Sequence, residues 1–144
     1  MSKVYIVYWT GTGNTAMMAG HIAEGVAEAG AEAVCLSVAE ANVADLEEAK
    51  AIALGCPSMG AEQLEEMEME PFMEMMDTEI SGKNIGLFGS YGWGNGEWMD
   101  DWVTRVGNDG AQVVGGEGVI CNGAPSEDAI EALKDLGRQL ASLS

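Results

Sequence analysis

The chain has 144 residues, of which 24 are acidic and 6 are basic, so its formal charge at neutral pH is −18. A surface this acidic repels phosphate backbones, which excludes nucleic acid as a partner and favours attraction to basic protein surfaces. The length fits a single domain over residues 1–144, and the 47% hydrophobic content supplies a core for it.

Five apolar or β-branched runs predict strands, at residues 4–9, 33–38, 51–56, 84–89 and 112–120. The stretches between and after them have helical spacing: residues 18–29, a short helix within 40–50, the acidic stretch 64–78, residues 99–106, and residues 130–140. Pro71 should begin or break the third helix, and Ser126 is placed to cap the last one. This alternation predicts an α/β fold, a doubly wound five-stranded parallel sheet with helices on both faces.

The first strand runs directly into Thr10-Gly11-Thr12-Gly13-Asn14-Thr15, and a helix pattern begins on the far side of this loop. Glycines let backbone N–H groups approach an anion, and the N-terminus of the following helix favours negative charge. The loop contains hydroxyl and amide side chains but neither Lys nor Arg. It therefore predicts a phosphate site built from uncharged donors.

Two further loops follow the third and fourth strands, and they are expected at the same edge of the sheet because parallel strands end together there. One is Ser58-Met59-Gly60-Ala61-Glu62 and the other is Ser90-Tyr91-Gly92-Trp93-Gly94. A thioether and an indole exposed between glycines suit the two faces of a flat aromatic ligand whose phosphate lies in the first loop.

Other sites fit the sequence less well. Residues 11–16 satisfy the dinucleotide pattern G-x-G-x-x-A, but Glu40 comes too late for the ribose contact and no substrate domain follows. The loop lacks the Lys of a nucleoside-triphosphate site. A phosphate-receiver domain would need Asp where Gly55-Cys56 stands. His21, the sole histidine, is expected on the surface, and the methionines of residues 67–76 are expected in part to pack inward rather than to bind a metal.

The cysteines and the first residues of the chain indicate the cellular compartment in which the protein is expected. Cys35, Cys56 and Cys121 are odd in number and widely spaced, which predicts buried thiols in a reducing compartment. Residues 1–3 lead straight into a strand, so no signal peptide is apparent, and no apolar run approaches the roughly 20 residues of a membrane helix. We expect a cytoplasmic monomer with no membrane insertion.

Three segments together resemble the flavodoxins, most closely the short-chain type of anaerobic bacteria. They are residues 8–15 (YWTGTGNT), 54–62 (LGCPSMGAE) and 86–94 (GLFGSYGWG), and the likeness extends over the whole chain in the same order. The resemblance implies strand order 2-1-3-4-5 and non-covalently bound FMN. It also implies an electron-transfer protein rather than an enzyme, a low-potential carrier of single electrons that alternates between the flavin semiquinone and hydroquinone.

The resemblance also implies roles for individual residues. Thr10, Thr12, Asn14 and Thr15 would hold the phosphate with help from Ser90, and Met59 and Trp93 would cover the two faces of the isoalloxazine. Glu62 would accept from the ring N3–H, and the Gly60 carbonyl would turn toward the protonated N5 of the semiquinone. The expected FMN site comprises Thr10, Gly11, Thr12, Gly13, Asn14, Thr15, Ser58, Met59, Gly60, Ala61, Glu62, Ser90, Tyr91, Gly92, Trp93 and Gly94.

Two positions depart from the usual flavodoxin pattern. Pro57 stands where a hydroxyl residue is common, so that phosphate contact is lost or moves to Ser58. Ala61 follows the pivotal glycine, where residues that tolerate positive φ are common. A type II turn would force Ala61 to positive φ at a cost of about 1 kcal/mol. We therefore expect a type II′ turn, with the positive φ on Gly60.

Acidic residues are expected around the ring: Glu62, Glu65, Glu66, Glu97, Asp100 and Asp101. Their repulsion would lower the potential of the second electron, because it opposes an anionic hydroquinone. The same acids favour basic-surfaced partners, an oxidoreductase donor and a reductase acceptor. A flavin-binding regulatory or sensor module of the same fold, without a general carrier role, is the alternative.

Overall fold

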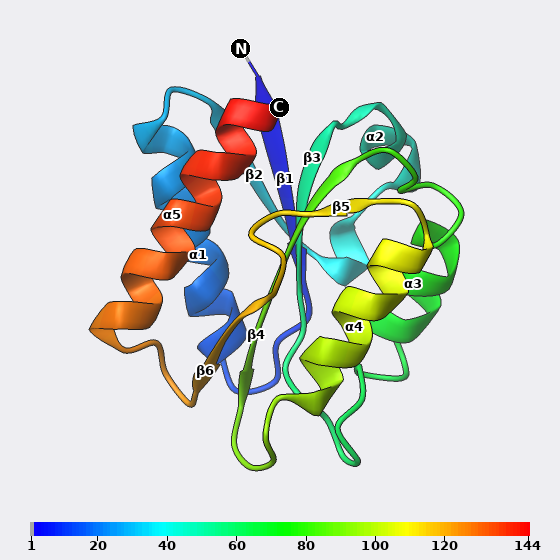
Figure 1. Cartoon of the computed structure of the whole chain (residues 1–144), viewed down its shortest axis with the longest axis vertical. Helices are drawn as coiled ribbons and strands as arrows, with labels where there is room; N and C mark the ends of the chain where they lie inside the picture. Colours follow the sequence, from blue (N-terminus) through cyan, green and yellow to red (C-terminus); the bar gives the residue numbers. More distant parts are fainter. Residues whose placement is uncertain (1) are drawn as a thin grey trace.

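The computed structural model describes residues 2–144, which form a parallel sheet between two layers of helices (Figure 1). The strands are β1 (Lys3–Tyr8), β2 (Glu32–Ser37), β3 (Ala51–Gly55), β4 (Asn84–Tyr91), β5 (Gln112–Val113) and β6 (Val119–Asn122). Their order is β2-β1-β3-β4-β5, with β6 also paired to β4, and every pairing is parallel. The predicted fold class and strand order are confirmed.

Helices cover both faces of the sheet. In Figure 1, α1 (Asn14–Glu28) and α5 (Glu127–Leu143) lie on one side, and α3 (Met69–Met76) and α4 (Glu97–Asn108) on the other. The short 3₁₀ helix η1 (Val38–Glu40) and α2 (Val43–Glu48) complete the second connection. Ser126 caps α5 as expected, because its Oγ accepts from the N–H of Ala129 at 3.3 Å. Pro71 lies in the first turn of α3 rather than inside a longer helix.

Side chains that alternate along the strands divide the core into two layers. Val7, Ile52, Leu54, Ile85 and Leu87 pack with α3 and α4, together with Met69, Met73 and Met76. Val4, Ile6, Ala53 and Phe88 face α1 and α5 instead. Because β3 is buried on both faces, as parallel strands usually are, its sequence is apolar throughout.

The helices α1 and α5 cross at unusually close range. A Cβ added to Gly25 would lie 2.0 Å from the Lys134 carbonyl oxygen, and one added to Gly137 would lie 2.1 Å from that of Ile22. Each helix therefore needs a residue without a side chain where it meets the other.

The predicted fifth strand is wrong in one respect. Residues 112–120 do not form one strand, because Gly115 and Gly116 take φ values of 83° and 81°, which are incompatible with extended backbone. The segment divides into β5 and β6, and both pair with β4 at successive positions.

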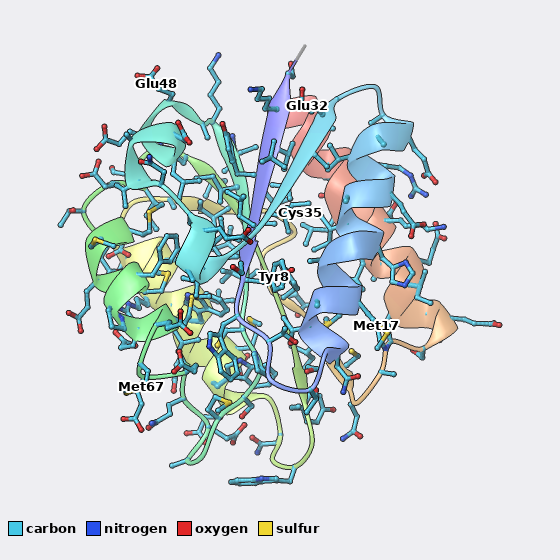
Figure 2. The ribbon with its side chains drawn as sticks, turned by 180° about the vertical axis from the view of Figure 1, so that it is seen from behind. Tyr8, Met17, Glu32, Cys35, Glu48 and Met67 are labelled. Atoms are coloured by element: carbon cyan, nitrogen blue, oxygen red, sulfur yellow. The ribbon has the colours of Figure 1, made fainter. Side chains whose placement is uncertain are left out.

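The expectation that all three cysteines are buried is wrong for Cys35. Cys56 and Cys121 are buried, but Cys35 is exposed because β2 is an edge strand. In Figure 2 Cys35 lies on β2 at the outside of the sheet. Within residues 2–144, no helix is both long enough and apolar enough to cross a lipid bilayer.

Candidate functional site

A cleft of about 280 Å³ opens where the carboxyl ends of β1, β3, β4 and β6 converge, at the end of the sheet opposite the chain termini (Figure 1). Its lining comes from four loops: Trp9, Gly11, Thr12, Asn14, Pro57, Ser58, Met59, Ser90, Tyr91, Gly92 and Gly123. The structure thus brings together the three loops that the sequence singled out. This is the edge where ligands bind in doubly wound sheets.

The first loop is preorganised by its own side chains. Thr10 Oγ1 accepts from the N–H of Gly13 at 3.1 Å, and Thr12 Oγ1 accepts from the N–H of Asn14 at 3.5 Å. Gly13, with a φ of 99°, turns the chain into α1. The loop therefore delivers backbone N–H groups and hydroxyls to the N-terminus of a helix, which is an anion-binding arrangement.

A buried pair of hydroxyls forms the floor of this loop. Thr15 Oγ1 lies 3.1 Å from Ser90 Oγ, and both residues are at least 95% buried. Thr15 is contributed by α1 and Ser90 by β4, so the pair ties the first loop to the start of the third. Neither residue carries charge. In the described part of the chain, no Lys or Arg contributes to the lining of the cleft.

The second loop is a closed hairpin. Met59 and Gln63 exchange two backbone hydrogen bonds, of 2.9 and 3.0 Å, which leaves Gly60, Ala61 and Glu62 at the tip. Gly60 takes a positive φ of 49°, as expected, and Ala61 does not. The expected four-residue type II′ turn is wrong, however, because the loop closes one residue later and places a second positive φ, 53°, on Glu62.

Glu62 joins the second loop to the third. Its Oε1 accepts from the N–H of Glu97 at 2.9 Å, at the beginning of α4. A Cβ on Gly94 would lie 2.9 Å from the Glu62 carboxyl carbon, so Gly94 leaves the space that this carboxylate fills. The carboxylate meets the positive end of the helix dipole there.

The remaining residues of the predicted site lie beside the cleft rather than in its lining. Gly60 and Ala61 are exposed at the hairpin tip, and Trp93 is 68% exposed. Tyr91, by contrast, lines the cleft and packs against the buried Trp98, with ring centroids 5.8 Å apart. An indole this exposed, next to Gly92 and Gly94, is free to lie over a ligand in the cleft.

Glu65 does not belong to the acidic rim. Its side chain is only 6% exposed, and its carboxylate accepts from the N–H groups of Met67, Glu68 and Met69 at 2.7, 2.8 and 3.0 Å. Desolvation raises the pKa of this carboxyl, but the three N–H groups outweigh it and leave the pKa lowered. The expectation that Glu65 contributes exposed charge near the ring is therefore wrong.

The predicted FMN site omitted three residues of the cleft lining: Trp9, Gly123 and Pro57, the last of which the sequence had marked only as a departure from the family pattern. Trp9 lines the cleft and donates from Nε1 to Glu68 Oε1 at 3.3 Å, and Gly123 closes it from the loop after β6. Trp9 and Gly123 directly follow the last residue of a parallel strand, and this position is the signal that could have identified them. No cluster of metal-binding side chains occurs among residues 2–144.

The donor set and the shape of the cleft fit a flavin mononucleotide. The first loop offers N–H and hydroxyl donors where a phosphate can lie, and the hydroxyl pair of Thr15 and Ser90 extends that donor set into the interior. Beyond it, Trp9, Met59 and Tyr91 offer apolar and aromatic walls of the kind that a planar ring system requires.

Comparison with known proteins agrees with this geometry. The sequence model of the flavodoxin family matches residues 6–135. The chain is 46% identical to the flavodoxin of Megasphaera elsdenii over 96% of its own length and 98% of the relative. It is 42% identical to the flavodoxin of Clostridium beijerinckii over 96% and 99% of the two chains.

Comparison with solved structures also finds flavodoxins. The solution structure of two-electron reduced Megasphaera elsdenii flavodoxin superposes with a TM-score of 0.89 at 45% identity, covering 96% of this chain and 98% of that one. A flavodoxin from the domain Archaea superposes with a TM-score of 0.86 at 26% identity, covering 97% and 96% of the two chains.

Fold and cleft together define an FMN-binding protein of the doubly wound α/β class. The chain belongs to the flavodoxin family. Its role is accordingly that of a flavodoxin, an electron carrier whose cofactor is FMN.

Proposed function

We propose that this protein carries single electrons at low potential between redox enzymes and catalyses no reaction of its own. FMN, when bound, supplies the ring that takes up and releases the electrons. The observation that carries the proposal is a phosphate loop of uncharged donors beside a cleft whose rim is acidic. Such a site holds a dianion without neutralising it, so the local field opposes further negative charge.

The binding roles proposed here are those that the flavodoxin resemblance implies. Thr10, Thr12, Asn14 and Thr15 would hold the phosphate, with help from Ser90. Ser58 supplies a hydroxyl beside Pro57, while its N–H is already used by the Ser90 carbonyl at 3.0 Å. Met59 and Trp93 would cover the two faces of the isoalloxazine. Glu62 would accept from the ring N3–H, and the Gly60 carbonyl would accept from N5–H.

The exposed acids separate the two electron-transfer steps. Glu97 and Asp100 lie in the first turn of α4 and are solvent-exposed, and Glu66 is exposed beyond the hairpin. Their charge makes the second electron harder to add, because it opposes an anionic ring. A hydrogen bond from N5–H to Gly60 would favour the first electron. Both effects widen the gap between the two potentials.

The decisive experiment is an anaerobic redox titration followed by visible spectroscopy, with the bound flavin extracted and identified. We expect FMN in equimolar amount and two well-separated one-electron steps. A colourless protein that does not take up FMN would contradict the proposal. A regulatory flavin sensor would bind FMN but would fail to pass electrons from a low-potential oxidoreductase to an acceptor.

We also propose basic-surfaced partners, an oxidoreductase that donates electrons and a reductase that accepts them, acting on a monomer in the cytoplasm. The end of the molecule that bears the cleft carries exposed acids and exposed apolar side chains, among them Met17, Met67 and Trp93. Figure 2 shows Met17 and Met67 near this end. The association rate with a partner should fall steeply as ionic strength rises, and a flat response would exclude steering.

A further inference from the structure

The hairpin of residues 59–63 carries Met59 to the cleft and places Gly60 and Glu62 beside it. At its tip, Glu62 ties it to α4 by accepting from the N–H of Glu97 at 2.9 Å. Before the hairpin, the N–H of Ser58 donates to the Ser90 carbonyl at 3.0 Å. After the hairpin, the chain continues through the buried Leu64 to Glu65. The position of the hairpin therefore depends on the Glu62 contact at its tip and on what holds Glu65 at its base.

Glu65 is held at both its backbone and its side chain. Its N–H donates to the Sγ of Cys56 at 3.4 Å, and its carboxylate accepts the three N–H groups that lead into α3. Its carbonyl accepts from the N–H of Glu70 at 2.8 Å. Glu68, the residue in the N-cap position, makes no side-chain cap, so Glu65 satisfies donors that would otherwise lack partners.

The sulfur that receives the Glu65 N–H is itself fixed. The backbone N–H of Cys56 donates to the Phe88 carbonyl at 3.1 Å, and its carbonyl oxygen accepts from Trp98 Nε1 at 3.1 Å. Burial raises the pKa of its thiol to about 12, so the sulfur stays uncharged. Glu65 thus links the rigid end of β3 and β4 to the beginning of α3.

We propose that Glu65 is a positioning residue for the flavin: by binding the N-terminus of α3 and the end of β3, it holds the hairpin of residues 59–63 against the cleft. The inference rests on the proposed FMN site. It assigns Glu65 a role distinct from that of its neighbour Glu66, which is exposed and has no such contacts. Without the carboxylate, the hairpin gains freedom that FMN binding must then remove.

The neighbouring pair offers a matched test. Glu65→Gln and Glu66→Gln remove the same charge one residue apart, but only the first weakens the hydrogen bonds into α3. Losing charge alone should raise the second one-electron potential, because an anionic ring meets less repulsion, and should leave the first nearly unchanged, because that electron is taken up together with a proton at N5. Losing the position of Gly60 should lower the first potential. The two effects fall on different potentials, so the measurement separates them.

We expect Glu65→Gln to weaken FMN binding about tenfold relative to Glu66→Gln in fluorescence titrations of the apoprotein. Its first one-electron potential should lie below that of Glu66→Gln. The amide protons of Met67, Glu68 and Met69 should exchange faster in Glu65→Gln and should be unchanged in Glu66→Gln. If Glu65 only capped α3 and had no influence on the flavin, Glu65→Gln would speed amide exchange and lower stability. FMN affinity and the first one-electron potential would then be equal in Glu65→Gln and Glu66→Gln.

A second variant covers the case in which Glu65→Gln does not fold. Glu65→Asp keeps the charge but shortens the reach to α3, so it should weaken FMN binding with no change in net charge. FMN affinities and first potentials that match in all variants would overturn the proposal. FMN binding by the wild-type protein is measured first, because a wild-type protein that fails to bind FMN would instead refute the proposed function.

Discussion

The ion cluster between α3 and α4 should make folding stability depend on pH. Arg105 forms two hydrogen bonds with Glu70, of 2.9 and 2.8 Å, and lies within 2.7 Å of Asp77. Asp109 adjoins Asp77, and its buried Oδ2 has no hydrogen-bond partner. Two carboxylates cannot donate to each other, so this atom gains a partner only when one proton is bound. Desolvation, then the hydrogen bond and repulsion from Asp77, raise the pKa of Asp109 to about 6.

The sign follows from proton linkage. Between the ordinary Asp pKa of 3.8 and about 6, the folded chain holds a proton at Asp109 that the unfolded chain lacks. The stabilisation that this protonated carboxyl gives the folded state is fully present below pH 3.8, and it is lost as the pH rises to about 6 and above. The pKa displacement sets a ceiling of about 3 kcal/mol. Solvent around Asp109 screens the interaction and reduces the expected effect to about 1 kcal/mol.

Asp109→Asn should therefore be more stable than wild type by about 1 kcal/mol above pH 7, because an amide donates to Asp77 at every pH. The difference should shrink toward pH 4.5, where wild-type Asp109 carries its own proton. Urea unfolding of the apoprotein measures this, since bound FMN would add its own contribution. Asp101→Asn, an exposed change of the same charge on α4, is the control. If Asp109→Asn is no more stable than wild type at neutral pH, or if its added stability does not change with pH, Asp77 and Asp109 do not share a proton.

Three further changes probe the site and the core. Thr15→Val should weaken FMN binding about tenfold but leave the affinity for riboflavin, which has no phosphate, unchanged; equal losses for both would remove Thr15 from the phosphate site. Gly89→Ala should cost about 3 kcal/mol in urea unfolding, because its Cβ would lie 2.1 Å from the Cys56 carbonyl oxygen, whereas Gly20→Ala meets nothing within 4 Å and should not destabilise. A thiol reagent should modify exposed Cys35 in the native protein and leave Cys56 intact, and equal rates would show that Cys56 is accessible.

The central strands could be predicted because their burial imposes a continuous apolar pattern. β3 and β4 are buried on both faces for most of their length and β1 at Val4, Ile6 and Val7, so their sequences carry little besides apolar residues and glycine. The edge of the sheet is governed by weaker constraints. There Gly115 and Gly116 break the fifth strand, and a window that averages hydrophobicity does not register two residues with positive φ.

The loops of the site could be predicted for a different reason. Parallel strands bring their carboxyl ends together, so residues that follow different strands can be assigned to one cleft before their contacts are known. What could not be predicted is the use that each side chain finds there. Glu62 and Glu65 differ little in sequence context, yet one reaches the first N–H of α4 and the other the N–H groups of α3. Those partners depend on how the helices are placed in space.

This difference alters how the acidic residues act on the flavin. A carboxylate whose oxygens accept backbone N–H groups at a helix N-terminus has part of its charge compensated by the helix dipole. Glu65 is compensated by three such groups and Glu62 by one, whereas Glu66 is exposed. A count of acids near the cleft therefore overstates the repulsion that an added electron meets. Glu62 and Glu65 shape the site chiefly by fixing the hairpin, and the exposed acids supply most of the field.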